Sequence, residues 1–177
     1  MDILVLYATL EGQTEKIAER IGQELRKQGH QVDIQSADQL PADFDLEPYK
    51  TAIIGGSIHM GRYPKSLKKF VQQYHDWLNK HPSALFTVCM AVKSQRPESR
   101  QEAEAYTEKF TTETQWQPTH TATFAGAVKY TKYGFLTRFI MKRIAKNEGG
   151  NTDTSRDHEY TDWDAVVRFA DQIVAKL

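Results

Sequence analysis

Residues 3–18, ILVLYATLEGQTEKIA, decide the fold of this chain. The first six of them form a continuous apolar run, which is typical of a parallel strand buried on both faces. Ile17, Ile21 and Leu25 then recur at helical spacing, and Gly29 is placed to end that helix. A buried strand that leads through a short polar loop into an amphipathic helix predicts the first half of a βαβ unit.

The same alternation of strand and helix continues to the end of the chain. We expect further strands over 31–36, 50–57, 84–90 and 121–128, and helices that begin at Pro64, before Ala103 and at Thr161, with Asp164 completing a capping box at Thr161. Five strands separated by helices predict a doubly wound α/β sheet in one domain over 1–177, where ligands bind beyond the carboxyl ends of the strands. The long connection between the fifth strand and the last helix departs from this pattern, and we treat 128–152 as an insert.

The composition of the 177 residues narrows the class of protein. An apolar content of 40% and a charged content of 26% are those of an ordinary globular domain. The single cysteine, Cys89, excludes an internal disulfide and is expected to be a small core residue. No apolar run approaches the roughly 20 residues needed to span a bilayer. The six histidines lack metal-ligand spacing and no nucleophile motif is present, so no metal and no hydrolytic site is expected.

The loop TLEGQT at 9–14 is the first candidate for a binding site. Thr9 and Thr14 provide hydroxyl groups, Gly12 permits a tight turn, and the free N–H groups at a helix start attract anions. The loop has neither the GxGxxG spacing of dinucleotide sites nor a Walker lysine, so it suits a single phosphate group. The alternative is a plain turn in which Thr9 or Thr14 caps the helix.

The stretch YATLEGQTEKIA resembles the FMN-phosphate loop of flavodoxin-like proteins, whose usual form is S/T-x-T-G-N/Q-T. Glu11 stands where a hydroxyl residue is usual, so we expect its side chain to point outward and only its backbone to serve as a ligand. Four further segments, 53–64, 86–98, 115–118 and 149–163, resemble one branch of these proteins. That branch is the quinone-dependent protoporphyrinogen IX dehydrogenases of bacterial haem synthesis.

The resemblance implies a flavodoxin-like sheet of strand order 2-1-3-4-5 that holds FMN non-covalently. It assigns the phosphate to one loop, the flavin ring to two more, and a closing segment to the return of the insert, where a simple turn is the alternative. The residues so implied are Thr9, Leu10, Glu11, Gly12, Gln13 and Thr14; Ser57, Ile58, His59 and Gly61; Cys89, Met90, Ala91, Val92 and Lys93; and Gly149, Gly150, Asn151 and Thr152.

Two of the residues beside the expected ring have competing interpretations, and so do the glycines of the loop. Gly55, Gly56 and Gly61 are expected to let the chain pass close to a flat ligand, with a glycine-rich turn as the alternative. His59 is either a proton donor or an ordinary surface histidine. Lys93 either stabilises a negatively charged reduced flavin or is a solvated loop residue. The sequence identifies no catalytic base.

The segment AVKYTKYGFLTRFIMKRIAK at 127–146 is a basic island in a chain of zero net charge. On a helical projection, Phe135, Leu136, Phe139, Ile140 and Ile144 fall on one side and most of the bases on the other. Such a helix predicts contact with a membrane surface or a partner, whereas the alternative is a helix that covers the sheet. Nucleic acid is a weaker option, because no binding motif accompanies the bases. The residues expected to contact substrate propionates or membrane are Lys129, Lys132, Arg138, Lys142, Arg143 and Lys146.

The resemblance implies FMN-dependent oxidation of protoporphyrinogen IX to protoporphyrin IX, with menaquinone or ubiquinone as acceptor. The implied location is the cytoplasm, in peripheral contact with the inner face of the cell membrane. The alternatives are a flavodoxin-type electron carrier, a soluble NAD(P)H:quinone reductase and a membrane-binding module without activity. The basic island and the neutral net charge count against the carrier, because flavodoxins are usually strongly acidic.

Overall fold

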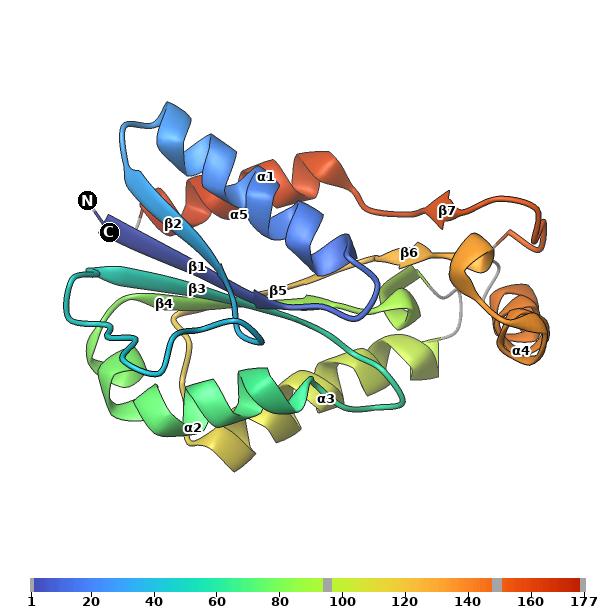
Figure 1. Cartoon of the computed structure of the whole chain (residues 1–177), viewed down its shortest axis with the longest axis horizontal. Coiled ribbons are helices and arrows are strands. Elements are labelled where there is room, and N and C mark those ends of the chain that lie inside the picture. Colours follow the sequence, from blue (N-terminus) through green and yellow to red (C-terminus); the bar gives the residue numbers. More distant parts are fainter. Residues whose placement is uncertain (1, 94–96, 148–150, 176–177) are drawn as a thin grey trace.

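The protein is a three-layer α/β sandwich around one parallel sheet, in a computed structural model that describes residues 2–93, 97–147 and 151–175 (Figure 1). The strand order β2-β1-β3-β4-β5 confirms the predicted doubly wound topology, and all four pairings are parallel. The strands are β1 (Asp2–Ala8), β2 (Gln31–Ser36), β3 (Thr51–Ser57), β4 (Ser83–Val88) and β5 (His120–Phe124).

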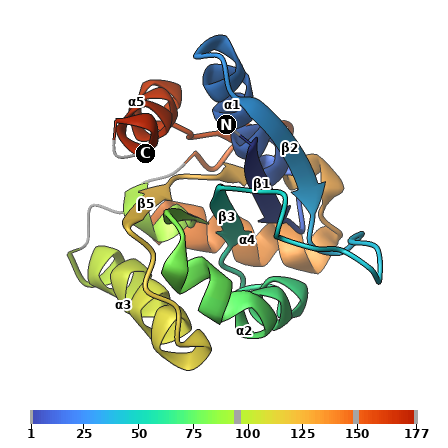
Figure 2. The same ribbon diagram turned by 90° about the vertical axis from the view of Figure 1, so that its left-hand side faces the viewer.

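Two helices cover each face of the sheet. Figure 2 shows α1 (Gln13–Lys27) and α5 (Trp163–Val174) on one side, with α2 (Lys65–Lys80) and α3 (Pro97–Thr114) on the other. The side chains of β1 divide between them in the period of two that a strand imposes. Ile3 and Val5 pack with α1 and α5, whereas Leu4 and Leu6 pack with α2 and α3. The sheet is therefore buried on both faces, which explains the continuous apolar run of its first strand.

The insert lies beyond the carboxyl ends of the strands, at the opposite end of the sheet from the N-terminus (Figure 1). Its stem consists of β6 (Ala127–Val128), which pairs antiparallel with β7 (His158–Glu159). Beyond the stem come two short helices, η2 (Tyr130–Lys132) and α4 (Phe135–Asn147). Since this is the end of the sheet where doubly wound proteins bind ligands, the insert is placed beside any bound cofactor.

Three predicted boundaries are wrong. The strand predicted over 84–90 ends at Val88, and Met90 begins the short helix η1 (Met90–Lys93). The strand predicted over 121–128 is two strands, β5 and β6, separated at 125–126. Asp162, not Thr161, caps α5, because its carboxylate accepts a hydrogen bond from the backbone N–H of Ala165 (3.0 Å). The Thr161 hydroxyl instead donates to the carbonyl of Ala125 (2.8 Å).

Candidate functional site

The loop between β1 and α1 presents an uncapped helix start. Gly12 precedes the helix at φ 87°, a left-handed conformation that glycine adopts without strain. The Thr9 hydroxyl accepts a hydrogen bond from the N–H of Gly12 (2.9 Å), so it supports the turn from within the loop. No side chain among the described residues caps α1, which argues against a plain turn capped by Thr9 or Thr14. The first turn of α1 therefore keeps its N–H groups available to an anion.

Buried polar atoms without partners in the described part of the chain include three at this end of the sheet. Thr14 is fully buried and Ser57 is 6% exposed, yet neither side-chain hydroxyl has a hydrogen-bond partner within the described part of the chain. The Oε1 atom of the buried Gln13 is also unpartnered, although its Nε2 donates to the Thr161 hydroxyl (2.9 Å). Each such atom costs about 1–3 kcal/mol if nothing else satisfies it. This donor and acceptor set fits an oxygen-rich group such as a phosphate with its polyol chain.

Sheet register brings these atoms together. Ala8 of β1 pairs with Gly56 of β3, so the loop after β1 and Ser57 are neighbours at the carboxyl end of the sheet. Val88 of β4 pairs with Ser57 in turn, which places η1 next to them. The three segments predicted to hold a flavin thus meet at one end of three adjacent strands, as the doubly wound topology requires.

The loop after β3 makes a tight turn that exposes an apolar tip. His59 and Arg62 exchange two backbone hydrogen bonds of 3.0 Å each. Between them, Met60 is 100% exposed at φ 49°, and Gly61 takes φ 72° against the ring of Tyr106. A fully exposed methionine at the predicted ring site is available to pack on a bound ligand.

Two glycines of this region have a different role from the one predicted. A Cβ atom on Gly55 would lie 1.9 Å from the ring of Phe86, and one on Gly56 would lie 2.5 Å from Leu67. Both glycines therefore make room for the protein's own core and not for a ligand. Gly61, in contrast, lies in the loop itself and needs its positive φ.

Burial disfavours the charged forms of His59 and Cys89. Desolvation lowers the pKa of the half-buried His59, and the Glu11 carboxylate opposes this with a smaller upward effect. Desolvation likewise raises the pKa of the Cys89 thiol, which is 8% exposed and therefore behaves as a core residue. Beyond it in η1, Met90, Ala91 and Val92 are half-buried and Lys93 is exposed.

Glu11 does not point out into solvent as predicted. Its carboxylate accepts hydrogen bonds from the phenol of Tyr133, at 2.7 Å to Oε1 and 2.8 Å to Oε2. Sequence reasoning gave Tyr133 no role. The two residues are 122 positions apart, and no local pattern carries such a signal. The loop after β1 and the insert are therefore in direct contact.

Arg138 braces the insert from within and is not a free surface cation. Its Nε donates to the carbonyl of Tyr130 (3.1 Å), and its terminal nitrogen donates to the carbonyl of Tyr133 (3.2 Å). The side chain is half-buried between these carbonyls. These two hydrogen bonds hold the turn before α4. The contact between Arg138 and substrate or membrane stays a prediction.

The other predicted bases differ in how free they are. Lys129 and Lys132 lie near Asp157, whose pKa is held low first by the backbone hydrogen bond from Thr131 and also by these two cations. Lys142, Arg143 and Lys146 are exposed on α4, and no ion pair engages them within the described part of the chain. The insert thus keeps three free cations in one helix.

The exposed face of α4 is mixed, whereas the projection separated apolar and basic faces. Phe135 is 90%, Phe139 is 59% and Ile140 is 48% exposed. Phe135, Phe139, Lys142 and Lys146 follow the i, i+4, i+7, i+11 spacing of a single helical stripe. The side chains of Leu136 and Ile144 lie outside the described ones. Among the described side chains of α4, aromatic rings and cations therefore share one solvent-facing surface.

The return of the insert is tied to the insert itself. The carbonyl of Asn151 accepts a hydrogen bond from the Tyr130 phenol (3.1 Å), and its N–H donates to the Tyr160 phenol (2.7 Å). Thr152 is half-buried. Gly149 and Gly150, which were predicted to close over the flavin, lie outside the described residues. Asn151 thus has a structural role that the sequence did not predict.

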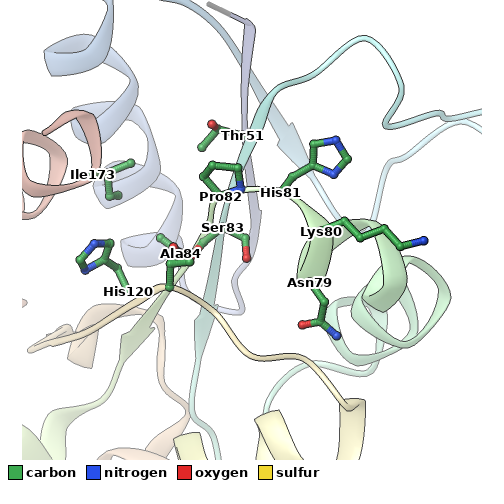
Figure 3. Close-up of a pocket in the computed structure, with 10 residues that line it drawn as sticks. Thr51, Asn79, Lys80, His81, Pro82, Ser83, Ala84, His120 and Ile173 are labelled. Carbon is green, nitrogen blue, oxygen red and sulfur yellow. Dashed lines mark hydrogen bonds between the residues drawn. The ribbon is translucent and has the colours of Figure 1, made fainter. Parts of the chain in front are cut away.

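A separate cavity of about 410 Å³ lies at the wrong end of the sheet for a cofactor. It is lined by the first residues of β3, β4 and β5, and Figure 3 shows Thr51, Ser83 and His120 around it. The Ser83 hydroxyl in its wall donates to the carbonyl of Leu78 (2.8 Å) and accepts from Trp116 Nε1 (2.9 Å). The cavity therefore lies beside structural hydrogen bonds at the amino ends of the strands, away from the carboxyl ends where ligands bind.

Within the described residues, no three His, Cys, Asp or Glu side chains lie close enough together to hold a metal ion. No helix in the same residues combines the length and apolar character needed to cross a bilayer.

Comparison with known proteins gives a consistent result. The profile of the flavodoxin domain family matches residues 4–155. Protoporphyrinogen IX dehydrogenase (quinone) of Escherichia coli strain K12 is 36% identical over 174 residues, covering 98% of this chain and 94% of that protein. The protein of the same name from Leishmania major is 32% identical over 176 residues, covering 97% of this chain and 74% of that protein.

Among solved structures, oxidised flavodoxin 1 from Bacillus cereus superimposes with a TM-score of 0.61 over 100% of this chain and 99% of its own. Its identity to this chain is 15%, so it supports the fold alone.

Proposed function

We propose that this chain oxidises protoporphyrinogen IX to protoporphyrin IX, because it belongs to the quinone-dependent protoporphyrinogen IX dehydrogenase family of flavodoxin-domain proteins. FMN is the cofactor and a membrane quinone, either menaquinone or ubiquinone, is the electron acceptor. The observation that carries the cofactor assignment is the pair of buried, unpartnered hydroxyls on Thr14 and Ser57 beside an uncapped helix start.

The chain's own residues bind and orient the reactants. The segment Thr9–Thr14 takes the phosphate through the first turn of α1, and the segments 57–61 and 89–93 border the flavin ring. When bound, FMN supplies two-electron oxidation, so removal of six electrons from the porphyrinogen takes three turnovers. Lys93 carries an exposed positive charge at the end of the segment that would border the ring, where it would stabilise negative charge on a bound flavin. Burial lowers the pKa of His59, so its charged form is disfavoured at this site.

We further propose that α4 contacts the inner face of the cell membrane, where the quinone is dissolved. Phe135 and Phe139 are exposed beside Lys142, Arg143 and Lys146, a combination that suits the boundary between headgroups and acyl chains. Each base contributes about 1 kcal/mol on an anionic lipid surface. The same cations are placed to pair with the two propionates of the porphyrinogen, because the insert lies at the carboxyl end of the sheet (Figure 1).

An anaerobic titration tests the proposed reaction directly. Protoporphyrinogen IX is expected to bleach the flavin absorbance of the holoprotein, and addition of a quinone is expected to restore it. NADH and NADPH serve as controls. Bleaching by a nicotinamide but not by porphyrinogen would make the protein an NAD(P)H:quinone reductase. No bleaching by any of the three, together with rapid reduction by a partner protein, would make it an electron carrier.

Loss of the unpartnered Thr14 hydroxyl is expected to have opposite effects on the stability of the apoprotein and on its affinity for FMN. We expect Thr14→Val to leave the apoprotein as stable as the parent or more stable by up to about 1 kcal/mol, because a buried unsatisfied group is removed. The same change is expected to weaken FMN binding about 10-fold. Urea unfolding of the apoprotein and a fluorescence titration with FMN measure the two effects.

Thr87→Val is the matched control for this prediction. Thr87 is also fully buried, but its hydroxyl lies 2.6 Å from the Tyr63 phenol, with which it shares a hydrogen bond. Its loss is expected to cost about 1–2 kcal/mol of stability and to leave the FMN affinity unchanged. If Thr14→Val destabilises the apoprotein as Thr87→Val does, Thr14 is a structural residue and not a ligand.

A further inference from the structure

The contact between Glu11 and Tyr133 joins the two parts of the proposed site. Glu11 belongs to the phosphate loop, and Tyr133 lies between η2 and α4 in the insert. Both carboxylate oxygens of Glu11 lie within 2.8 Å of the phenol oxygen. Both side chains are half-buried, so this hydrogen bond to a charged acceptor is partly shielded from water.

The position of Tyr133 is itself fixed by the insert. Arg138 donates to the carbonyl of Tyr133, and the ring of Tyr130 packs edge-on against that of Tyr133 with centroids 6.2 Å apart. The backbone N–H of Lys129 also donates to the Tyr133 phenol oxygen at 3.3 Å. A shift of the phenol would therefore be transmitted to η2 and to the start of α4.

The charge of Glu11 works against the loop in which it stands. The Glu11 carboxylate stands one residue before Gly12, so it competes with a bound phosphate for the positive end of the helix. A phosphate dianion there and the Glu11 carboxylate repel each other. The hydrogen bond to Tyr133 holds the carboxylate toward the insert, and burial together with this bond raises the pKa of the Tyr133 phenol, which keeps it protonated as the donor.

We propose that Glu11 and Tyr133 form a latch that docks the insert on the phosphate loop. In this arrangement Glu11 is a positioning residue. Its carboxylate weakens binding of the cofactor phosphate by repulsion, and it fixes the insert beside the substrate. The proposal rests on the proposed function for its effect on turnover. Its effects on FMN affinity and on insert order can be measured without any porphyrinogen.

Tyr133→Phe opens the latch and leaves the carboxylate free. We expect α4 to be cleaved by trypsin at Lys142 or Arg143 about 10-fold faster in the apoprotein, a factor typical of one lost hydrogen bond to a charged group. The KM for protoporphyrinogen should rise by about the same factor. The FMN affinity should fall about 3- to 10-fold, because the carboxylate can now turn toward the phosphate.

Glu11→Thr opens the same latch but removes the charge. Trypsin cleavage and KM should change as in Tyr133→Phe, whereas FMN should bind about 3- to 10-fold more tightly than to the parent. Glu11→Gln keeps an acceptor for the phenol, so it should retain the parent's cleavage rate and KM while also binding FMN more tightly. The double variant Glu11→Thr/Tyr133→Phe should match Glu11→Thr alone, because both changes act on one interaction.

Tyr7→Phe is the matched control, because the phenol of Tyr7 in β1 donates to Glu15 of α1 at 2.6 Å and thus also pairs a tyrosine with a carboxylate near the phosphate loop, but outside the insert. It should leave cleavage, KM and FMN affinity at parent values. Opposite signs of the FMN effect in Tyr133→Phe and Glu11→Thr support the latch, since general destabilisation lowers both affinities. Equal cleavage rates in the parent and both latch variants, or an FMN affinity that Glu11→Thr leaves unchanged or lowers, would overturn it. Absence of porphyrinogen oxidation in the parent would refute the proposed function while these two measurements still decide the latch.

Discussion

Replacement of residues 129–146 by a short Gly-Ser linker is expected to lower protoporphyrinogen oxidation by about 100-fold or more, the size of effect that a lost positioning element produces. The shortened protein should remain folded and yellow, because no described side chain of residues 129–146 belongs to either core cluster. The stem survives the deletion, since Ala127 pairs with Glu159 and Val128 with His158. Flavin content and steady-state turnover measure the two outcomes. The FMN affinity should fall only by the factor seen for Tyr133→Phe.

Normal turnover in the shortened protein would refute a role for the insert in substrate or quinone access. A charge variant separates the two proposed roles. Lys142→Gln/Arg143→Gln/Lys146→Gln should weaken binding to anionic vesicles by about 3 kcal/mol in total. With a water-soluble quinone, it should lower turnover only if the cations also hold the propionates. Lys50→Gln/Lys69→Gln/Lys80→Gln, which removes three exposed cations outside the insert, is the control for net charge.

The fold could be predicted because its determinants are local. Strand β2 spans the predicted 31–36, and α1 is followed by Gly29 at φ 85°, as its stop signal indicated. Buried parallel strands need unbroken apolar runs, and the helices between them need one apolar stripe, so each element carries its own signal. The phosphate loop could be predicted for the same reason, because its glycine and its hydroxyl residues lie close together in the chain.

The wrong boundaries arise where residues distant in the chain form hydrogen bonds with the backbone of the predicted element. The run 121–128 has the composition of one strand, but Thr161 and Tyr160 donate hydrogen bonds to the carbonyls of Ala125 and Gly126. The chain therefore leaves the main sheet after Phe124 and continues in the stem. The same contact takes the Thr161 hydroxyl away from the helix start, which leaves the capping role to Asp162.

Side-chain direction in the site was the least predictable feature. Arg138 was placed on the outer face by helical projection, yet two carbonyls of the preceding turn attract its guanidinium inward. Glu11 was expected to avoid the phosphate by pointing to solvent, and it avoids it by binding Tyr133 instead. Partners that fold over from far along the chain decide both cases, so neither loop nor helix periodicity contains the answer.

Gly55 and Gly56 lie at the end of β3, as expected, but the predicted reason for having glycine there was wrong. Gly55 stands at the carboxyl end of the sheet, where a flat ligand is expected, and this suggested clearance for the flavin. The ring of Phe86, its partner on β4, occupies that clearance on the face covered by α1 and α5. The two reasons differ in what they predict for the protein without its cofactor.

Gly55→Ala is therefore expected to destabilise the apoprotein by about 3 kcal/mol, because a methyl group 1.9 Å from the ring of Phe86 forces the core to shift. For a chain of this size the melting temperature should fall by about 6–12 °C. Gly134→Ala is the control, since no atom lies within 4 Å of the added Cβ, and it should change stability by less than about 1 kcal/mol. The double variant Gly55→Ala/Phe86→Leu should recover part of the loss, because the smaller side chain gives back the space. If Gly55→Ala leaves the apoprotein at parent stability and weakens FMN binding alone, the clearance belongs to the ligand after all.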